Sequence, residues 1–164
     1  MNIEIRLSPN KSSRPTDAPI DMIVIHATAS LSFDNSLSWM LNKASQVSCH
    51  YLIGKDGKIV QLVPDALKAY HAGISSWDGR SDLNRFSIGI ELVNLNDKAD
   101  EYPKEQMASL SLLVADLMRK YAILPRNVVG HNMIAPLRKT DPGPKFPWFD
   151  LGYRLGLQFN KTIT

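Results

Sequence analysis

Three residues that lie far apart in the sequence carry side chains suited to a metal site. His26 directly follows the apolar run at residues 20–25, and His131 directly follows the short segment 127–130. Asp141 comes ten residues after His131. Two imidazoles and one carboxylate form the ligand set of an open catalytic zinc site, whose fourth position is left to water or substrate. We therefore predict that these three residues bind Zn²⁺.

Each of these residues also has an ordinary explanation. A single histidine is most often a structural or surface residue, and an aspartate before a proline is common in turns without function. The joint pattern favours the metal site, because both histidines end predicted strands and Asp141 lies on a segment stiffened by prolines. Such a segment loses little conformational entropy when it becomes ordered.

Hydrolysis at a zinc site also needs a base that takes a proton from water, and Glu91 is our candidate. The segment 87–93 alternates, so its isoleucines and Leu92 share one face while Glu91 projects from the other face beside small neighbours. If this strand is central, the carboxylate is partly desolvated, which raises its pKa and favours a general base. The alternative is an ordinary glutamate on a solvent-facing strand.

The same chemistry needs a donor that stabilises the oxyanion of the tetrahedral intermediate. Lys139 lies two residues before Asp141 and is our candidate for this donor. On the residues alone, an ordinary surface lysine is the more common explanation.

Signatures of other hydrolases are absent from the sequence. It contains no Gly-x-Ser-x-Gly elbow, no His-Glu-x-x-His motif and no glycine-rich phosphate loop. The single cysteine, Cys49, excludes an intrachain disulfide and any cysteine-rich metal motif. Cys49 directly precedes His50, and adjacent strand residues point to opposite faces, so we interpret Cys49 as a buried, unreactive thiol.

The elements that must position these residues alternate between strands and helices. Periodicity predicts strands at residues 20–25, 49–53, 59–63, 87–93 and 127–130, and amphipathic helices at 33–41 and 104–121. The Asp-Gly pair at residues 56–57 predicts a hairpin turn, and residues 72–85 are interpreted as a long loop. This order indicates an α/β sheet covered by helices, with both metal-site histidines at carboxyl ends of strands.

Length and composition predict one domain. The 164 residues are 44% apolar, enough to bury a core, and we divide them into an extended lead-in at 1–19 and a catalytic domain at 20–164. The net charge of +3 would favour an anionic polymer such as a cell wall or nucleic acid, but a solvated surface with a few extra lysines is the more common explanation. We find no secretory signal and no apolar run long enough to cross a bilayer, so we expect a cytoplasmic protein without a membrane partner.

Several segments of the sequence match, in one order, motifs of a known family. They are residues 23–26, 47–51, 56–61, 71–73, 84–91, 130–131 and 134–144. Over about residues 20–148 the chain resembles the zinc-dependent N-acetylmuramoyl-L-alanine amidases of the amidase-2 type. These enzymes are related to peptidoglycan-recognition proteins and to phage lysozyme-type amidases.

The resemblance implies a single-domain α/β fold in which a central mixed β-sheet is flanked by α-helices and the metal lies at the floor of a groove. It also implies roles for individual residues. These are His26, His131 and Asp141 as zinc ligands, Glu91 as general base, Lys139 as oxyanion stabiliser, and Tyr70, His71 and Asn84 as substrate contacts.

The implied reaction is hydrolysis of the amide between the lactyl group of N-acetylmuramic acid and L-alanine, in peptidoglycan or in muropeptides. We expect a monomer that serves cell-wall recycling or remodelling and does not bind nucleic acid. Two alternatives stay open at this point: a phage-type lytic amidase, or endolysin, and a peptidoglycan-binding module without catalysis.

The chain departs from parts of the family pattern in two places. Relatives with cysteine as the third ligand carry a catalytic tyrosine just before the histidine that matches His50, whereas this chain has Cys49 there and Asp141 as the third ligand. It therefore resembles the aspartate branch, in which glutamate does the work of that tyrosine. Tyr70 stands where many relatives carry tryptophan.

Overall fold

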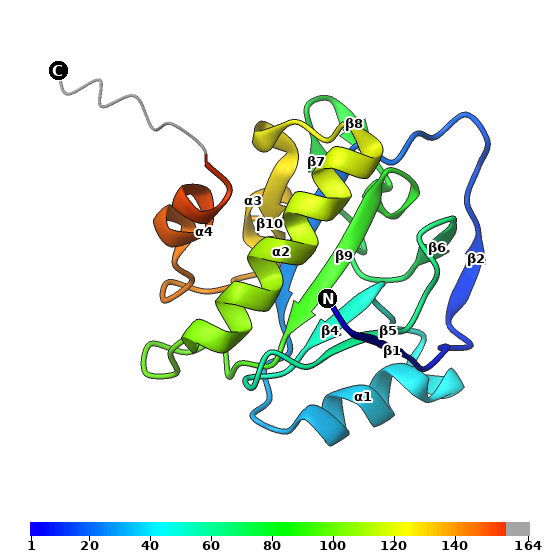
Figure 1. The fold of residues 1–164 in the computed structure, drawn as a ribbon. Coiled ribbons are helices and arrows are strands. Elements are labelled where there is room, and N and C mark those ends of the chain that lie inside the picture. Colours follow the sequence, from blue (N-terminus) through cyan, green and yellow to red (C-terminus); the bar gives the residue numbers. More distant parts are fainter. Residues whose placement is uncertain (157–164) are drawn as a thin grey trace, which may run out of the picture.

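A six-stranded β-sheet forms the centre of the computed structural model, which describes residues 1–156 (Figure 1). The strands lie across the sheet in the order β1, β5, β4, β9, β3, β10. Their bounds are β1 Ile3–Ile5, β3 Met22–Ala27, β4 Tyr51–Ile53, β5 Ile59–Gln61, β9 Ser87–Leu92 and β10 Val128–Gly130. The α-helices of the described part are α1 Phe33–Leu41, α2 Lys104–Tyr121, α3 His131–Ile134 and α4 Trp148–Arg154.

The pairing of the strands makes this sheet mixed. β4 and β5 are antiparallel, whereas β3 pairs in parallel with β9 and β10, and β4 pairs in parallel with β9. The antiparallel pair is the predicted hairpin, and Gly57 in its turn has a φ of 82°, which a glycine adopts without strain. The prediction of a central mixed sheet flanked by helices is confirmed.

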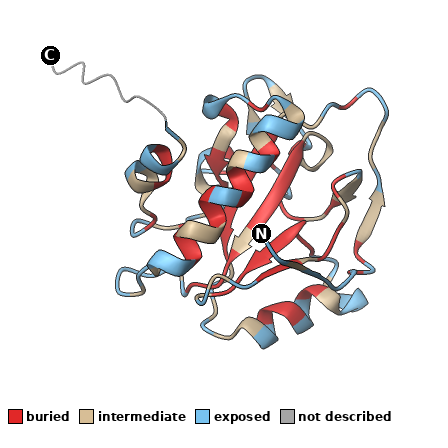
Figure 2. Cartoon of the chain, viewed as in Figure 1, coloured by how far each residue is buried: buried red, intermediate tan, exposed pale blue. Residues whose placement is uncertain are grey.

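The helix α2 crosses one face of the sheet (Figure 1). The buried residues of α2 recur at helical spacing, and Figure 2 shows buried and exposed positions alternating along it. They pack on alternate residues of the strands to form the main core, which includes Ile23, Ile25, Ile53, Ile88, Ile90, Leu92, Met107, Leu110, Leu113, Val114 and Leu117. Since apolar burial is the dominant favourable term in folding, this layer is central to stability.

The opposite face of the sheet is only partly covered by a helix. α1 begins after Ser32, whose side chain accepts a hydrogen bond from the backbone N–H of Asn35 and so caps the helix. The apolar side of α1 packs in a smaller cluster that contains Leu37, Met40, Cys49, Leu52, Val60, Leu62 and Val93. A third apolar cluster covers another part of this face and contains Met22, Val24, Ala72, Leu83, Val129 and Ile134. Buried polar side chains gather on this face at the carboxyl ends of β3 and β9.

Residues 72–85 contain more regular structure than the predicted loop. β7 (Ser76–Trp77) and β8 (Arg80–Ser81) form a small antiparallel hairpin, and a 3-10 helix follows at Leu83–Arg85. The Asp-Gly pair between the strands has positive φ at both residues, as a two-residue hairpin turn requires. The loop prediction is wrong here, because strands of two residues are too short to give an alternating pattern.

The end of the described chain also differs in part from the prediction. Residues 142–147, rich in proline, are free of helix and strand, but α4, which we did not predict, begins directly after Pro147. Proline is tolerated at the start of a helix because the first helical N–H groups have no partner within the helix. No helix among residues 1–156 is long and apolar enough to cross a membrane.

The predicted lead-in, residues 1–19, contributes two strands. β1 pairs in parallel with β5 at one edge of the main sheet, and β2 (Lys11–Ser13) pairs antiparallel with β6 (Leu67–Ala69). Arg14 then extends its guanidinium group inward and donates hydrogen bonds to backbone carbonyls of several separate segments. The domain boundary at residue 20 stays a prediction, and residues 157–164 of the predicted domain lie outside the described residues.

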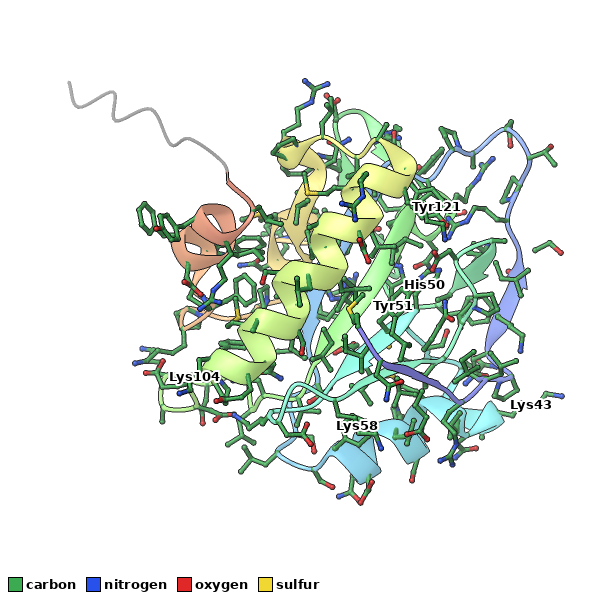
Figure 3. All side chains as sticks on the ribbon, in the orientation of Figure 1. Lys43, His50, Tyr51, Lys58, Lys104 and Tyr121 are labelled. Carbon is green, nitrogen blue, oxygen red and sulfur yellow. The ribbon has the colours of Figure 1, made fainter. Side chains whose placement is uncertain are left out.

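The buried carboxylate of Asp65 ties the end of α2 to the sheet. It accepts hydrogen bonds from the hydroxyls of Tyr51 and Tyr121 at 2.7 and 2.8 Å and from Nζ of Lys120 at 2.9 Å. Figure 3 labels the two tyrosines. Burial by itself raises the pKa of Asp65, but these donors hold it below its usual value. Asp65 is therefore an ionised anchor on the α2 side of the sheet.

Candidate metal centre and active site

Three side chains from separate segments converge on the face opposite α2. Nδ1 of His26 lies 2.9 Å from Nδ1 of His131 and 3.2 Å from Oδ2 of Asp141, and Nδ1 of His131 lies 3.1 Å from the same oxygen. All three residues are buried. The structure thus brings together the three predicted ligands in a group that could hold a metal ion.

Local structure explains how two of these residues reach the site. β10 pairs in parallel with β3, so His131 leaves the sheet at the edge where β3 ends, as predicted. A Cβ atom at Gly130 would lie 2.8 Å from Cδ of Pro142, so glycine allows the proline segment to pack against the strand. The carbonyl of Asp141 accepts a hydrogen bond from the N–H of Asn132 at 2.8 Å, which holds the loop beside α3.

The protonation of these groups suits metal binding. Burial lowers the pKa of His26 to about 4, so its imidazole is neutral at neutral pH. Burial alone would raise the pKa of Asp141, but contacts with His131 and His26 hold it well below its usual value. Nε2 of His131 lies 3.1 Å from the carbonyl oxygen of Ala72. Because a carbonyl only accepts, Nε2 of His131 carries the proton and its Nδ1 offers a lone pair to the site.

Glu91 lies on the same face as the three converging residues. On β9 it is the direct neighbour of His26 across the parallel pair of strands. Its Oε2 atom is buried and has no hydrogen-bond partner among the described residues. Burial, helped by the negative charge of Asp141 and opposed by Lys139, raises the pKa of Glu91 to about 8. The prediction of a desolvated carboxyl with a raised pKa is confirmed, whereas its role as general base stays a prediction.

Lys139 lies on the turn between α3 and Asp141. Its backbone N–H donates a hydrogen bond to the carbonyl of Ala135 at 2.9 Å, which closes this turn. Its side chain lines the same cavity as the converging residues. The structure therefore places a cation beside the site, and its role towards an oxyanion stays a prediction.

A cavity of about 800 Å³ opens over this group. Its size is typical of pockets for small ligands. On α1 and the segment that follows it, the lining residues include Trp39, Met40, Gln46 and Val47, and from later segments they include Asn96, Arg138 and Thr140. Trp39 is half exposed at 57%, so an aromatic ring is available to a ligand in the cavity.

The three predicted substrate contacts, Tyr70, His71 and Asn84, all line this cavity, but two of them have other partners. Oδ1 of Asn84 accepts hydrogen bonds from the backbone N–H groups of His71 and Ala72, at 3.1 and 2.8 Å. The ring of His71 is buried, and its Nδ1 lies 3.0 Å from Nε2 of His26. Contact of these residues with substrate stays a prediction, and Tyr70 is the one whose side chain has no hydrogen-bond partner among residues 1–156.

His50 was not predicted as part of the site, yet it belongs to the same buried group of rings. Its ring lies 5.7 Å from that of His71 between centroids, and its Nδ1 accepts a hydrogen bond from the N–H of Gly89 at 3.0 Å. Burial lowers the pKa of His50 to about 4.

Its neighbour Cys49 is buried, and burial raises the pKa of the thiol well above its usual value, which supports the prediction of an unreactive cysteine.

Arg138 is a second residue that was not predicted as part of the site. Its Nη2 donates hydrogen bonds to the carbonyls of Ala72 and Ile74, at 2.8 and 2.7 Å, and so holds the segment around Gly73 next to the turn that carries Arg138. Gly73 between them has a φ of 57°, and a Cβ atom there would lie 3.1 Å from the guanidinium. The family motif at residues 71–73 was visible in the sequence. Its contact with Arg138 was not, because Arg138 lies 65 positions after Gly73.

Comparison with known proteins agrees with this geometry. A family model described as N-acetylmuramoyl-L-alanine amidase matches residues 16–144. The N-acetylmuramoyl-L-alanine amidase AmiD of Escherichia coli K12 is 41% identical over 161 residues, covering 89% of this chain and 57% of AmiD. The 1,6-anhydro-N-acetylmuramyl-L-alanine amidase AmpD of Citrobacter freundii is 48% identical over 103 residues, covering 63% and 54%. The chain thus spans a little over half the length of these relatives.

Solved structures extend the agreement to the fold. The structure of a selenomethionine derivative of AmpD has a TM-score of 0.81 at 34% identity and covers 93% of both chains. AmiD of E. coli, in complex with the substrate anhydro-N-acetylmuramic acid-L-Ala-D-γ-Glu-L-Lys, has a TM-score of 0.78 and covers 88% of this chain and 61% of that one. Because the family match covers most of the sequence and the fold agrees over nearly all of it, this chain belongs to the N-acetylmuramoyl-L-alanine amidase family.

Proposed function

We propose that this chain is a zinc hydrolase that cleaves the amide between the lactyl group of N-acetylmuramic acid and L-alanine in a peptidoglycan fragment. The observation that carries the proposal is the buried group of His26, His131 and Asp141, with Glu91 beside it on the same face of the sheet. Membership of the amidase family supports the reaction class.

The residues present fit a zinc ion. In a tetrahedral site with bonds of about 2.0 to 2.1 Å, the ligand atoms lie about 3.3 Å apart. The two Nδ1 atoms and the Oδ2 atom described above are separated by 2.9 to 3.2 Å. Two imidazoles and one carboxylate are suitable donors for Zn²⁺, and they leave the fourth position for water or substrate.

Glu91 and Lys139 supply the proton transfer and the charge stabilisation. A bound zinc ion polarises the scissile carbonyl and makes water a better nucleophile at neutral pH. Glu91 accepts the proton that the attacking water releases and passes it to the leaving amine. Its raised pKa, about 8 without a metal, makes the carboxyl a strong base once it is ionised. Lys139 stabilises the negative charge on the carbonyl oxygen.

The cavity supports a muropeptide as the substrate. AmiD has been solved with an anhydro-muramyl peptide, and AmpD is named for the same anhydro sugar. The cavity of about 800 Å³ combines the exposed ring of Trp39 with amide, hydroxyl and cationic side chains. A sugar linked to a short peptide presents both apolar ring faces and many hydrogen-bonding groups, which such a mixed lining can bind.

The test uses the purified chain with a defined anhydro-muramyl tripeptide. We expect release of the free stem peptide, detected by mass spectrometry, in preparations that contain one zinc ion per chain. Activity should disappear on chelation and return when zinc is added. Hydrolysis that survives complete removal of zinc contradicts the mechanism, and tight binding of the tripeptide without hydrolysis by the zinc-loaded chain favours a binding module instead.

A parallel digest separates a recycling enzyme from a lytic one. Faster release of peptide from soluble anhydro-muropeptides than from intact sacculi is expected for recycling, and the reverse for a lytic amidase. The earlier expectations of a cytoplasmic monomer that binds neither nucleic acid nor membranes stay predictions.

A further inference from the structure

A series of hydrogen-bonded side chains leads from the interior of the protein to Nε2 of His26, the ring nitrogen that faces away from the proposed metal site. Nε2 of His26 lies 3.0 Å from Nδ1 of His71, and Nε2 of His71 lies 3.2 Å from Oγ of Ser87. The hydroxyl of Ser87 donates to the carbonyl of Leu83 at 2.7 Å. We propose that His71 is a positioning residue that fixes the tautomer and orientation of His26, so that Nδ1 of His26 offers its lone pair to the metal. This inference rests on the zinc site of the proposed function.

The donor and acceptor of each hydrogen bond in this series can be assigned by starting from the carbonyl of Leu83. The carbonyl of Leu83 only accepts, so the single hydroxyl proton of Ser87 is committed to it. Oγ of Ser87 must then accept from Nε2–H of His71, which leaves Nδ1 of His71 as an acceptor. Nδ1 of His71 in turn accepts from Nε2–H of His26. A neutral imidazole with its proton on Nε2 has its lone pair on Nδ1, the atom that faces the site.

The opposite tautomer of His26 would not bind a metal through this atom. A proton on Nδ1 would point at Oδ2 of Asp141 and Nδ1 of His131, which lie 3.2 and 2.9 Å away. An internal hydrogen bond to the carboxylate would then replace coordination. By holding the proton on the far nitrogen, His71 opposes this competing arrangement.

One dipeptide supports both zinc-site histidines. The side chain of His71 holds His26, while the carbonyl of Ala72 accepts from Nε2 of His131 at 3.1 Å. Oδ1 of Asn84 accepts hydrogen bonds from the backbone N–H groups of both His71 and Ala72, and these bonds hold the dipeptide in place. The two metal-facing nitrogens are thus oriented from a single short segment.

The sheet leaves space for His71 at one position. A Cβ atom at Gly89 would lie 2.4 Å from Cγ of His71, a distance that no real contact allows. Glycine on β9, two residues after Ser87, therefore makes room for the ring against the strand. Because the ring is buried there, it has little freedom to turn away from His26.

The experiment compares three variants with the wild-type chain. His71→Phe keeps a ring but removes both nitrogens, His71→Asn keeps an acceptor near the place of Nδ1, and Ser87→Ala keeps the imidazole but removes the group that orients it. Tyr51→Phe serves as the control, because it removes a buried hydroxyl that bonds Asp65 on the other side of the sheet.

Two measurements are made on each protein: the dissociation constant for Zn²⁺, by competition with a chelator, and the tautomer of His26 in the zinc-free chain, from ¹⁵N and ¹H chemical shifts of its ring. For His71→Phe we expect zinc affinity to fall roughly 10- to 100-fold, as is usual when a group that orients a ligand is lost. The Nδ1–H tautomer of His26 should then appear. His71→Asn should recover part of the affinity, Ser87→Ala should lose less than His71→Phe, and Tyr51→Phe should bind zinc like the wild type.

The outcomes separate this inference from the proposed function. Wild-type zinc affinity and an unchanged His26 tautomer in the His71 and Ser87 variants would overturn the positioning role while leaving the zinc amidase intact. A wild-type chain that binds no zinc would overturn both. If His71→Phe fails to fold, Ser87→Ala and His71→Asn still decide the question, because Ser87→Ala keeps the imidazole of His71 and His71→Asn keeps a polar side chain at that position.

Discussion

The two faces of the central sheet are built from the same strands, but one face carries the apolar core under α2 and the other carries the buried histidines and Glu91. On β9, Ile90 points into the apolar core under α2, whereas the adjacent Glu91 points to the face with the converging histidines. On β3 the same holds for Ile25 and His26. All four histidines of the chain are buried and lie in series, with ring centroids 4.4 to 5.7 Å apart.

The contrast shows that one strand can serve stability and chemistry through alternate residues. The α2 face gains free energy by removing apolar surface from water. The opposite face desolvates imidazoles and carboxyls, which costs stability unless each polar atom has a partner. The buried Oε2 of Glu91 has no partner among the described residues, so part of this cost is paid where we propose that the reaction takes place.

The largest expected effect is loss of a metal ligand. In His26→Ala we expect both bound zinc and amidase turnover to fall to background, because two protein ligands hold Zn²⁺ poorly in a catalytic site. Zinc content by mass spectrometry and release of stem peptide check this. Ile25→Val, one residue away on the α2 face, is the matched control and should keep both. Equal loss in the two variants would break the proposed division between the faces.

Next in size is removal of the base. Glu91→Gln keeps the shape of the side chain but cannot accept a proton, so we expect turnover to fall by roughly 10²- to 10⁴-fold. Zinc content should stay at the wild-type level, since Glu91 is not among the three converging ligands. Steady-state rates and zinc content are measured on the same preparation. Loss of zinc in this variant would instead assign Glu91 to holding the metal.

The histidine face should also make the stability of the zinc-free chain depend on pH. His26 and His50 have a pKa of about 4 when folded, below the usual 6.5, so the unfolded chain takes up protons first as the pH falls. The free energy of unfolding should therefore fall between pH 6.5 and 4, by roughly 3 kcal/mol for each histidine.

Glu91 acts in the opposite direction in the same experiment. Its pKa of about 8 lies above the ordinary 4.5, so its contribution to stability is present at low pH and is lost as the pH rises towards 8. We expect maximal stability near pH 6.5 in urea titrations of the chelated protein, and Glu91→Gln should remove the decline above that pH. A flat profile from pH 4 to 8 would contradict the buried state of these groups.

The smallest expected effect comes from the apolar side. Ile90→Val removes one methylene from the core under α2, and we expect it to lower the free energy of unfolding by about 1 kcal/mol. Zinc content, turnover and the shape of the pH profile should not change, because Ile90 faces away from the site. Urea unfolding and the activity assay check this, and a change in zinc affinity would show that the two faces are coupled.

Long periodic elements could be predicted from the sequence, and short ones could not. The helix at 104–121 and the alternation around Glu91 were correct, because several turns or pleats repeat the same pattern. The hairpin at 76–81 and the short strand β6 were missed, because their pairing depends on neighbours rather than on a pattern of their own. The helix α4 was missed because it has seven residues and follows a proline-rich segment.

The candidate ligands could be selected because residue type and position agreed. His26 and His131 stand at the ends of strand-like segments, where α/β folds place their sites. The position of the His71 ring behind His26 could not be predicted in this way. Its ring meets His26 across 45 positions of sequence and depends on Gly89 leaving space on another strand. Neither relation has a local pattern.

The sequence by itself determined which residues alternate between the two faces, where the main strands and helices run, and which histidines and carboxylates end at one edge of the sheet. Only the tertiary structure decided which histidines face the proposed metal, which one supports another from behind, and on which nitrogen each proton resides. The physical reason is distance along the sequence: periodicity reflects the surroundings of a residue a few positions away, whereas the contacts of His26 with His71 and Asp141 join residues 45 and 115 positions apart.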